Sequence, residues 1–326
     1  MKKKLVSILV PCYNEVESLP HLYEEVCKVM ETLTQYEWEL LFVNDGSQDK
    51  TMAIIRDLSV KDERISYVDL SRNFGKENAM LAGFDYVRGD CMILMDADLQ
   101  DPPSLIPKML IHWEEGYDDV YAKRKDRGEE SWLRKRFSLF FYWLLDKSTR
   151  FNILKNVGDF RLLDRKCIDA LKGLREKERY TKGLFCWIGY KKKEILFNRG
   201  NRLYGQSHWN FFQLAGLAVE GLVSFTVSPL RWATYLGMFV GTGAFVYLIW
   251  ILIKVMIWGD PVAGFPTLIS VILFLGATQL MAIGILGEYL GKIFTETKGR
   301  PIYLVQEYHC GGKVEKQLAN HKTDRS

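Results

Sequence analysis

The sequence predicts an α/β domain built on a parallel sheet, followed by two membrane-spanning helices. Over residues 5–125, short apolar runs alternate with amphipathic stretches of helical length, which is typical of a doubly wound parallel sheet. Two long apolar stretches follow at residues 233–259 and 261–287, with Lys254 as their only charge. Because a helix crosses a bilayer with about 20 apolar residues, each stretch is long enough to span one.

The strands and helices of the first part can be placed by their patterns. The run at residues 5–10 is apolar without interruption, as expected of a strand covered by helices on both faces of the sheet. Apolar residues then recur at helical spacing, at Leu19, Leu22, Val26, Val29 and Leu33. Further strands are expected at residues 38–43, 65–70, 91–95 and 119–122, with helices between them around residues 54–58, 79–87 and 105–115.

Polar side chains follow the ends of these strands, which is where parallel α/β sheets bind their ligands. Asp96 and Asp98 come directly after the strand at residues 91–95. Alternate residues of an extended chain point the same way, so both carboxylates can face one spot, and such a pair with substrate phosphates is typical of Mg²⁺ sites. A solvated turn is the alternative for this pair alone. The metal site is favoured by the polar residues after the other strands, namely Tyr13, Glu15, Asp45 and Lys76.

Composition and motifs argue against several other classes of protein. The net charge of +4 predicts no nucleic-acid partner. The six cysteines are scattered without a Cys-x-x-Cys pair, which argues against a zinc site and against a disulfide framework. Neither a Gly-x-Gly-x-x-Gly fingerprint nor a P-loop occurs. The apolar run at residues 5–10 is too short for a signal-peptide core, so we do not expect the α/β part to be secreted.

Basic and aromatic residues before the apolar stretches indicate contact with a membrane. Arginines and lysines gather at residues 124–136 and lead into an aromatic run at 137–145, as in a helix lying on a bilayer. A core helix with a solvated basic end is the alternative. Residues 209–231 are also expected at the interface. Cations flank the two long stretches, so the positive-inside rule places both chain ends and the α/β domain in the cytoplasm; these cations are Arg231, Lys292, Lys298 and Arg300.

Five separate motifs occur in the order found in family 2 glycosyltransferases: VPCYNE (10–15), VNDGS (43–47), SRNFG (71–75), MDADLQDP (95–102) and GDFRL (158–162). More narrowly, the chain resembles bacterial polyprenyl-phosphate sugar transferases related to dolichyl-phosphate mannose synthase, over residues 5 to about 308. The resemblance implies a GT-A fold with a Rossmann-like sheet, a nucleotide-sugar donor and Mg²⁺ or Mn²⁺. It also implies inverting transfer of one sugar to undecaprenyl phosphate. UDP-glucose and UDP-N-acetylglucosamine are the leading donors.

The resemblance also implies roles for individual residues. Asp96, Asp98 and Gln100 would hold or flank the metal. Donor binding would involve Pro11, Tyr13, Glu15, Asp45, Lys76, Arg202 and His208. His208 departs from the family, which usually has Ser-Lys where this chain has Ser207-His208. Asn44-Asp45 likewise replaces a frequent Asp-Asp pair, which leaves Asp45 as the expected contact.

The acceptor side completes the set of predicted residues. We expect Asp159 to orient the acceptor or the sugar rather than to abstract a proton, because a phosphate acceptor with a second pKa of about 6 is already anionic. Arg124, Arg127 and Arg136 are expected to draw the lipid phosphate to the membrane edge. Together with Asp96 and Asp98, Asp159 forms the predicted catalytic group.

These inferences define a domain plan and leave rival functions open. The plan is a cytoplasmic catalytic domain at 1–208, an interfacial segment at 209–231, two transmembrane helices at 232–290 and a cytoplasmic tail at 291–326. A processive polysaccharide synthase would usually carry Gln-x-x-Arg-Trp, whereas Arg231-Trp232 here follows Ser-Pro-Leu. A catalytically silent nucleotide-binding membrane scaffold and a transferase acting directly on protein or cell-wall polymer are further alternatives. Self-association into a homo-oligomer is left open.

Overall fold

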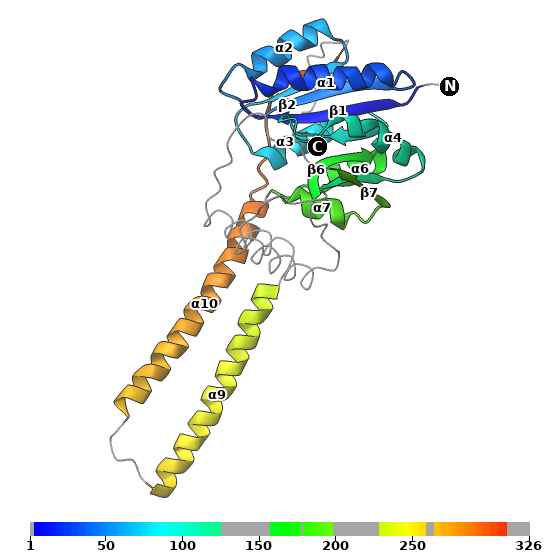
Figure 1. Cartoon of the computed structure of the whole chain (residues 1–326). Coiled ribbons are helices and arrows are strands. Elements are labelled where there is room, and N and C mark those ends of the chain that lie inside the picture. The colour runs from blue at the N-terminus through cyan, green and yellow to red at the C-terminus, as the bar shows by residue number, and fades with distance from the viewer. Residues whose placement is uncertain (1–2, 125–156, 178, 198–227, 259–263, 312–326) are drawn as a thin grey trace, which may run out of the picture. The chain divides into compact units, whose positions relative to one another are not determined.

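The computed structural model describes residues 3–124, 157–177, 179–197, 228–258 and 264–311 (Figure 1). The chain divides into two compact units. The sheet unit comprises Met1–Asp146, Phe151–Asn210 and Arg300–Ser326, and the helical unit comprises Lys147–Arg150 and Phe211–Gly299. The predicted residues Arg127, Arg136, Arg202 and His208 lie outside the described residues, as does most of the predicted interfacial segment.

Within the described residues, the sheet unit contains an 8-stranded sheet in the order β7-β5-β6-β4-β1-β2-β3-β8. Its strands are β1 (Leu5–Cys12), β2 (Glu37–Asn44), β3 (Ile65–Leu70), β4 (Cys91–Leu94), β5 (Asp119–Arg124), β6 (Val157–Asp164), β7 (Lys192–Phe197) and β8 (Val305–His309). The five strands expected from the sequence are all present, within a few residues at their ends. The predicted α/β fold is therefore confirmed.

The sheet is mixed, so the expectation of a parallel sheet is wrong for β6, which lies inside the sheet, and for β8 at its edge. The central strands β4, β1, β2 and β3 are parallel, but β6 runs antiparallel to β4 and β5, and β8 runs antiparallel to β3. The edge strand β7 is again parallel to β5. Neither β6 nor β8 was expected as a strand, and the direction of a strand depends on where the preceding connection brings the chain back to the sheet.

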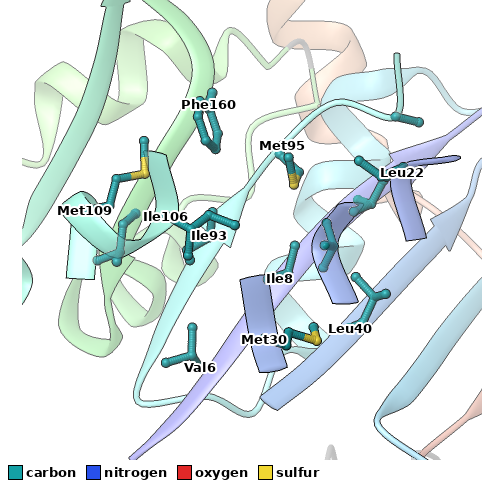
Figure 2. Close-up of a cluster of buried hydrophobic side chains, with 14 of the residues drawn as sticks. Val6, Ile8, Leu22, Met30, Leu40, Ile93, Met95, Ile106, Met109 and Phe160 are labelled. Carbon is teal, nitrogen blue, oxygen red and sulfur yellow. The ribbon is translucent and has the colours of Figure 1, made fainter. Parts of the chain in front are cut away.

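Helices cover both faces of the sheet. They are α1 (Ser18–Thr32), α2 (Thr51–Lys61), α3 (Lys76–Tyr86), α4 (Ile106–Glu114, after a short 3₁₀ turn at Pro103–Leu105), α6 (Arg165–Gly173) and α7 (Thr181–Trp187). Figure 2 shows part of the core, in which Leu22 and Met30 of α1 and Ile106 and Met109 of α4 meet the strands. The opposite face carries α3, where a Cβ on Gly83 would lie 2.3 Å from the Leu9 side chain. This close approach packs α3 directly against β1.

The helical unit contains two long helices, α9 (Ser228–Trp258) and α10 (Phe265–Thr297). By length and composition, one segment among the described residues could cross a membrane, at Phe274–Thr297 in α10. The second predicted span is therefore not confirmed. Helix α10 also continues past residue 290, where the predicted membrane segment ended. The strand β8 after it was not predicted from the sequence.

Candidate functional site

A pocket of about 280 Å³ lies at the carboxyl ends of β1, β2 and β4 and at the start of α3. It is lined by Pro11, Cys12, Tyr13, Glu15, Asp45, Asn73, Gly75, Lys76, Ala79, Asp96, Ala97 and Asp98. Most of the described residues that the sequence analysis selected are therefore brought together here. Gln100, Arg124 and Asp159 are not among the lining residues.

Side-chain hydrogen bonds join the loop after β1 to the loop after β2. Asn14 adopts a left-handed conformation with φ 56°, and its backbone N–H donates to Ser47 Oγ at 3.0 Å. In return, the Asn14 side-chain oxygen accepts from the backbone N–H of Gln48 at 2.9 Å. Asparagine tolerates the left-handed region better than most residues. The loop that carries Tyr13 and Glu15 is thereby held against its neighbour.

Asp45 braces the loop after β3. Its two carboxylate oxygens accept the backbone N–H groups of Phe74 at 2.7 Å and Gly75 at 2.9 Å. Burial raises the pKa of Asp45, and the two N–H donors oppose this shift only in part. Gly75 has φ +93°, a conformation that L side chains rarely adopt. Asp45 was predicted to contact the donor. It also fixes the position of the first residue of α3, Lys76.

Lys76 joins two carboxylates that are distant in the sequence. Its ammonium lies 2.6 Å from Asp96 Oδ1 and 2.7 Å from Asp159 Oδ2. Burial alone would lower the pKa of Lys76, but the attraction of Asp96 and Asp159 outweighs burial and raises it. Burial likewise would raise the pKa of Asp159, but Lys76 and Lys182 hold it below its ordinary value. Asp159 is therefore an ionised, paired carboxylate beside the pocket.

Asp96 and Asp98 suit a divalent cation whose remaining coordination sites are filled by substrate phosphates. Asp98 Oδ1 accepts the backbone N–H of Gln100 at 3.1 Å. The side chain of Gln100 is buried, and its Oε1 finds no hydrogen-bond partner among the described residues. Hard carboxylate and amide oxygens are the ligands that Mg²⁺ and related ions prefer. Among the described residues, no cluster of three or more His, Cys, Asp or Glu could enclose an ion by itself.

Two further cations lie near Gly158 and Asp159, and one of them was not predicted. Lys182 Nζ is 4.0 Å from Asp159 Oδ1, and no pattern in the sequence pointed to it. Arg124 ends β5, and its guanidinium lies close to Gly158, where a Cβ would be 3.6 Å from Nη2. The predicted lipid-phosphate residue Arg124 is thus placed beside the residue that precedes Asp159.

Arg161 is a buried cation within the GDFRL motif for which the sequence predicted no function. Its side chain is 2 % exposed, lies 3.3 Å from Asp119 Oδ2 and stacks 3.7 Å from the ring centroid of Phe185 in α7. Alternate residues of a strand share a face, so Arg161 lies on the same side of β6 as Asp159. The ion pair joins β6 to β5, and the stacking joins β6 to α7.

Comparisons with known proteins identify the family. The model of glycosyl transferase family 2 matches residues 7–171, and that of the GtrB C-terminal hairpin matches residues 228–293. A prophage-derived bactoprenol glucosyl transferase of Shigella flexneri is 42% identical, over 94% of this chain and 99% of that protein. A prophage bactoprenol glucosyl transferase homolog of Escherichia coli is 41% identical over 92% and 98%. An uncharacterised glycosyltransferase of Synechocystis is 43% identical over 93% and 95%.

Among solved structures, glucosyl-3-phosphoglycerate synthase of Mycobacterium tuberculosis, crystallised with Mn²⁺ and UDP-glucose, matches with a TM-score of 0.43 and 16% identity. That match covers 68% of this chain and 77% of the other. The family match and the mixed α/β sheet assign the GT-A fold to the sheet unit. The chain therefore belongs to glycosyl transferase family 2, and the protein is a glycosyltransferase.

Proposed function

We propose that the protein transfers one sugar, with inversion, from a UDP-sugar to undecaprenyl phosphate on the cytoplasmic side of a membrane. The observation that carries the proposal is the pocket at the strand ends, which combines the acidic pair Asp96 and Asp98 with the cation Lys76. The relatives named bactoprenol glucosyl transferase support a polyprenyl-phosphate acceptor, and they favour glucose over N-acetylglucosamine.

Donor binding is assigned to residues of the pocket wall. Pro11, Tyr13, Glu15 and Asp45 would contact the base and ribose, and Tyr13 is 43% exposed and accessible to a ligand. Lys76 would contact the diphosphate. Arg202 and His208, which lie outside the described residues, are assigned to the same diphosphate on the basis of the sequence. Arginine suits that position because its fork of donors matches phosphate geometry.

Asp96, Asp98 and Gln100 would hold Mg²⁺ or Mn²⁺. When bound, such an ion supplies Lewis-acid neutralisation of the diphosphate leaving group. Asp159 would orient the acceptor or the sugar. Its pKa is lowered by Lys76 and Lys182 against the effect of burial, and a carboxylate so paired is a weak base. The acceptor phosphate needs no base, because it is already anionic near neutral pH. Arg124, Arg127 and Arg136 would attract the lipid phosphate.

The path of the chain supports two membrane crossings. Strand β8 follows α10 and pairs with β3, so residues on either side of the helical unit belong to one sheet. Those residues must lie on the same side of any membrane, which requires an even number of crossings between them. We therefore propose that α9 and α10 both span, with residues 209–231 at the interface. Residues 1–208 and the segment after α10 would then face the cytoplasm.

A donor panel tests this function. The full-length protein in detergent would be incubated with undecaprenyl phosphate, MgCl₂ and either labelled UDP-glucose or labelled UDP-N-acetylglucosamine. We expect one labelled lipid species, formed from UDP-glucose, on thin-layer chromatography. A ladder of products would indicate a processive synthase. Absence of transfer from every UDP-sugar tested, with donor binding intact, would instead favour a silent nucleotide-binding scaffold.

A further inference from the structure

The ammonium of Lys76 occupies the position on Asp96 where a divalent cation would bind. Lys76 Nζ lies 2.6 Å from Asp96 Oδ1 and 2.8 Å from Oδ2, so it contacts both oxygens of that carboxylate. A metal ligated by Asp96 would need the same lone pairs. An ammonium in contact with both oxygens and a doubly charged ion on the same carboxylate would repel each other strongly.

We propose that Lys76 is a place-holder cation, which neutralises Asp96 in the donor-free enzyme and leaves it when a divalent ion arrives together with the donor diphosphate. This inference rests on the proposed function, because it takes Asp96 as a metal ligand. It adds a regulatory role: the metal site is weak until the donor is present, since only the donor offers the displaced ammonium a new anionic partner.

The surroundings of Lys76 allow the side chain to move while its backbone stays in place. The backbone is fixed by Asp45, which accepts the N–H groups of the two residues that precede Lys76. The side chain is 42% exposed and ends in a flexible four-carbon stem. Lys76 is also bonded to Asp159 at 2.7 Å, so the ammonium keeps one carboxylate partner when it leaves Asp96.

Asp159 determines where the Lys76 ammonium remains after it leaves Asp96. Its carboxylate is 9% exposed and has Lys182 as a second, more distant cation at 4.0 Å. Release of Asp96 therefore leaves Lys76 between Asp159 and the space where the donor phosphates would lie. A bound metal occupies Asp96 and so frees Lys76 for the donor phosphates. A bound donor holds Lys76 and so frees Asp96 for the metal. Each ligand should therefore tighten the binding of the other by the same factor.

Binding of Mn²⁺ to the full-length protein in detergent tests the proposal without using catalysis. The free Mn²⁺ signal in electron paramagnetic resonance would be titrated with MnCl₂, first without and then with a saturating concentration of UDP. In the absence of UDP, Lys76→Met should bind Mn²⁺ about tenfold more tightly than the wild type, because one repelling charge is removed. The factor by which UDP tightens Mn²⁺ binding should be smaller in this variant than in the wild type.

Two matched variants separate charge from structure. Lys76→Arg keeps the charge and should bind Mn²⁺ in the absence of UDP within about threefold of the wild type. Lys182→Met removes a cation that lies 4.0 Å from Asp159, whereas the ion pair of Asp96 is with Lys76, so this change should alter Mn²⁺ affinity less than about twofold. Thermal unfolding of each variant verifies that the fold is intact.

The outcomes distinguish this inference from the proposed function. If Asp98→Asn abolishes Mn²⁺ binding but Lys76→Met leaves it unchanged or weaker, the metal site stands and the place-holder role is overturned. If Lys76→Arg or Lys182→Met tightens binding as much as Lys76→Met, the charge at Asp96 is not the cause, and the role is again overturned. If the wild type binds no Mn²⁺ even with UDP, the proposed metal site fails and the inference fails with it.

Discussion

The sheet unit and the helical unit differ in the solvent exposure of their large apolar side chains. In the sheet unit, large apolar side chains such as Phe42 and Phe84 are fully buried at 0% exposure. In the helical unit, Phe239 of α9 is 78% exposed and Leu280 of α10 is 71% exposed. The residue types are alike, but packing within the chain covers the side chains of the sheet unit and leaves these side chains of α9 and α10 exposed.

This difference identifies what stabilises each unit. Burial of apolar surface contributes about 25 cal/mol per Å², so the sheet unit can be stable on its own contacts. Helices that leave many large apolar side chains uncovered are typical of a surface that another apolar phase covers, as in the membrane-spanning arrangement proposed above. The comparison therefore predicts that matched substitutions should affect the stability of the sheet unit strongly in one unit and weakly in the other.

Removal of a core aromatic ring should give the largest effect. Phe42→Ala in β2 should destabilise the sheet unit by about 3–5 kcal/mol, because it leaves a cavity in a closely packed core. The matched substitution Phe239→Ala in α9 should leave the unfolding transition of the sheet unit within about 0.5 kcal/mol of the wild type. Chemical denaturation of the detergent-solubilised protein measures both. Equal losses for the two variants would contradict the comparison.

Neutralisation of a predicted metal ligand should abolish most activity without affecting either unit. Asp98→Asn keeps the oxygen that accepts the Gln100 N–H but removes the charge. Sugar transfer should fall by about 10²–10³-fold, since the leaving diphosphate loses its electrostatic stabilisation. The control Asp57→Asn, on the exposed surface of α2, should retain full activity. Wild-type turnover by Asp98→Asn would remove this residue from the proposed mechanism.

Introduction of a charge should have different effects at exposed apolar residues of the helical unit and of the sheet unit. Leu280→Arg in α10 should weaken membrane insertion by about 2.5–3.5 kcal/mol if that position lies near the bilayer centre. Val60→Arg in α2 alters a side chain that is 88% exposed in the sheet unit, and should change stability by less than about 0.5 kcal/mol. Carbonate extraction of membranes and thermal unfolding measure these effects. Complete retention of Leu280→Arg in the membrane fraction would argue against a spanning α10.

The smallest effect concerns the acid stability of the sheet unit. Lys76 and Lys182 overcome the effect of burial and lower the pKa of Asp159 in the folded protein, below the value of about 3.9 expected in the unfolded chain. The ionised carboxylate therefore stabilises the fold above about pH 4, and this contribution is lost as the pH falls through the folded-state pKa.

Asp159→Asn removes this pH-dependent contribution. The difference in unfolding free energy between the wild type and Asp159→Asn should shrink as the pH falls from about 6 to about 3. Urea denaturation at a series of pH values measures it. A difference that stays constant over that range would show that pairing with Lys76 does not couple the ionisation of Asp159 to folding.

The parts of the site that could be predicted are the polar residues that follow apolar strands, because parallel strands bring their carboxyl ends to one edge of the sheet. Asp96 and Asp98 are one residue apart after an apolar run, so their common direction follows from strand geometry alone. The bridge from Lys76 to Asp159 spans 83 residues and depends on the pairing of β6 beside β4. No local pattern could have indicated that pairing. The roles of Lys182 and the buried Arg161 could not be predicted for the same reason.

The sequence by itself determined the alternation of strands and helices, the polar residues at the strand ends, the two apolar stretches and the family. Each of these depends on residues that are close together in the sequence or on short motifs. Tertiary structure decided the directions of β6 and β8, the return of the chain to β3 after α10, and the sharing of Lys76 between Asp96 and Asp159. Those features depend on which distant segments pack together, and packing is a property of the whole fold.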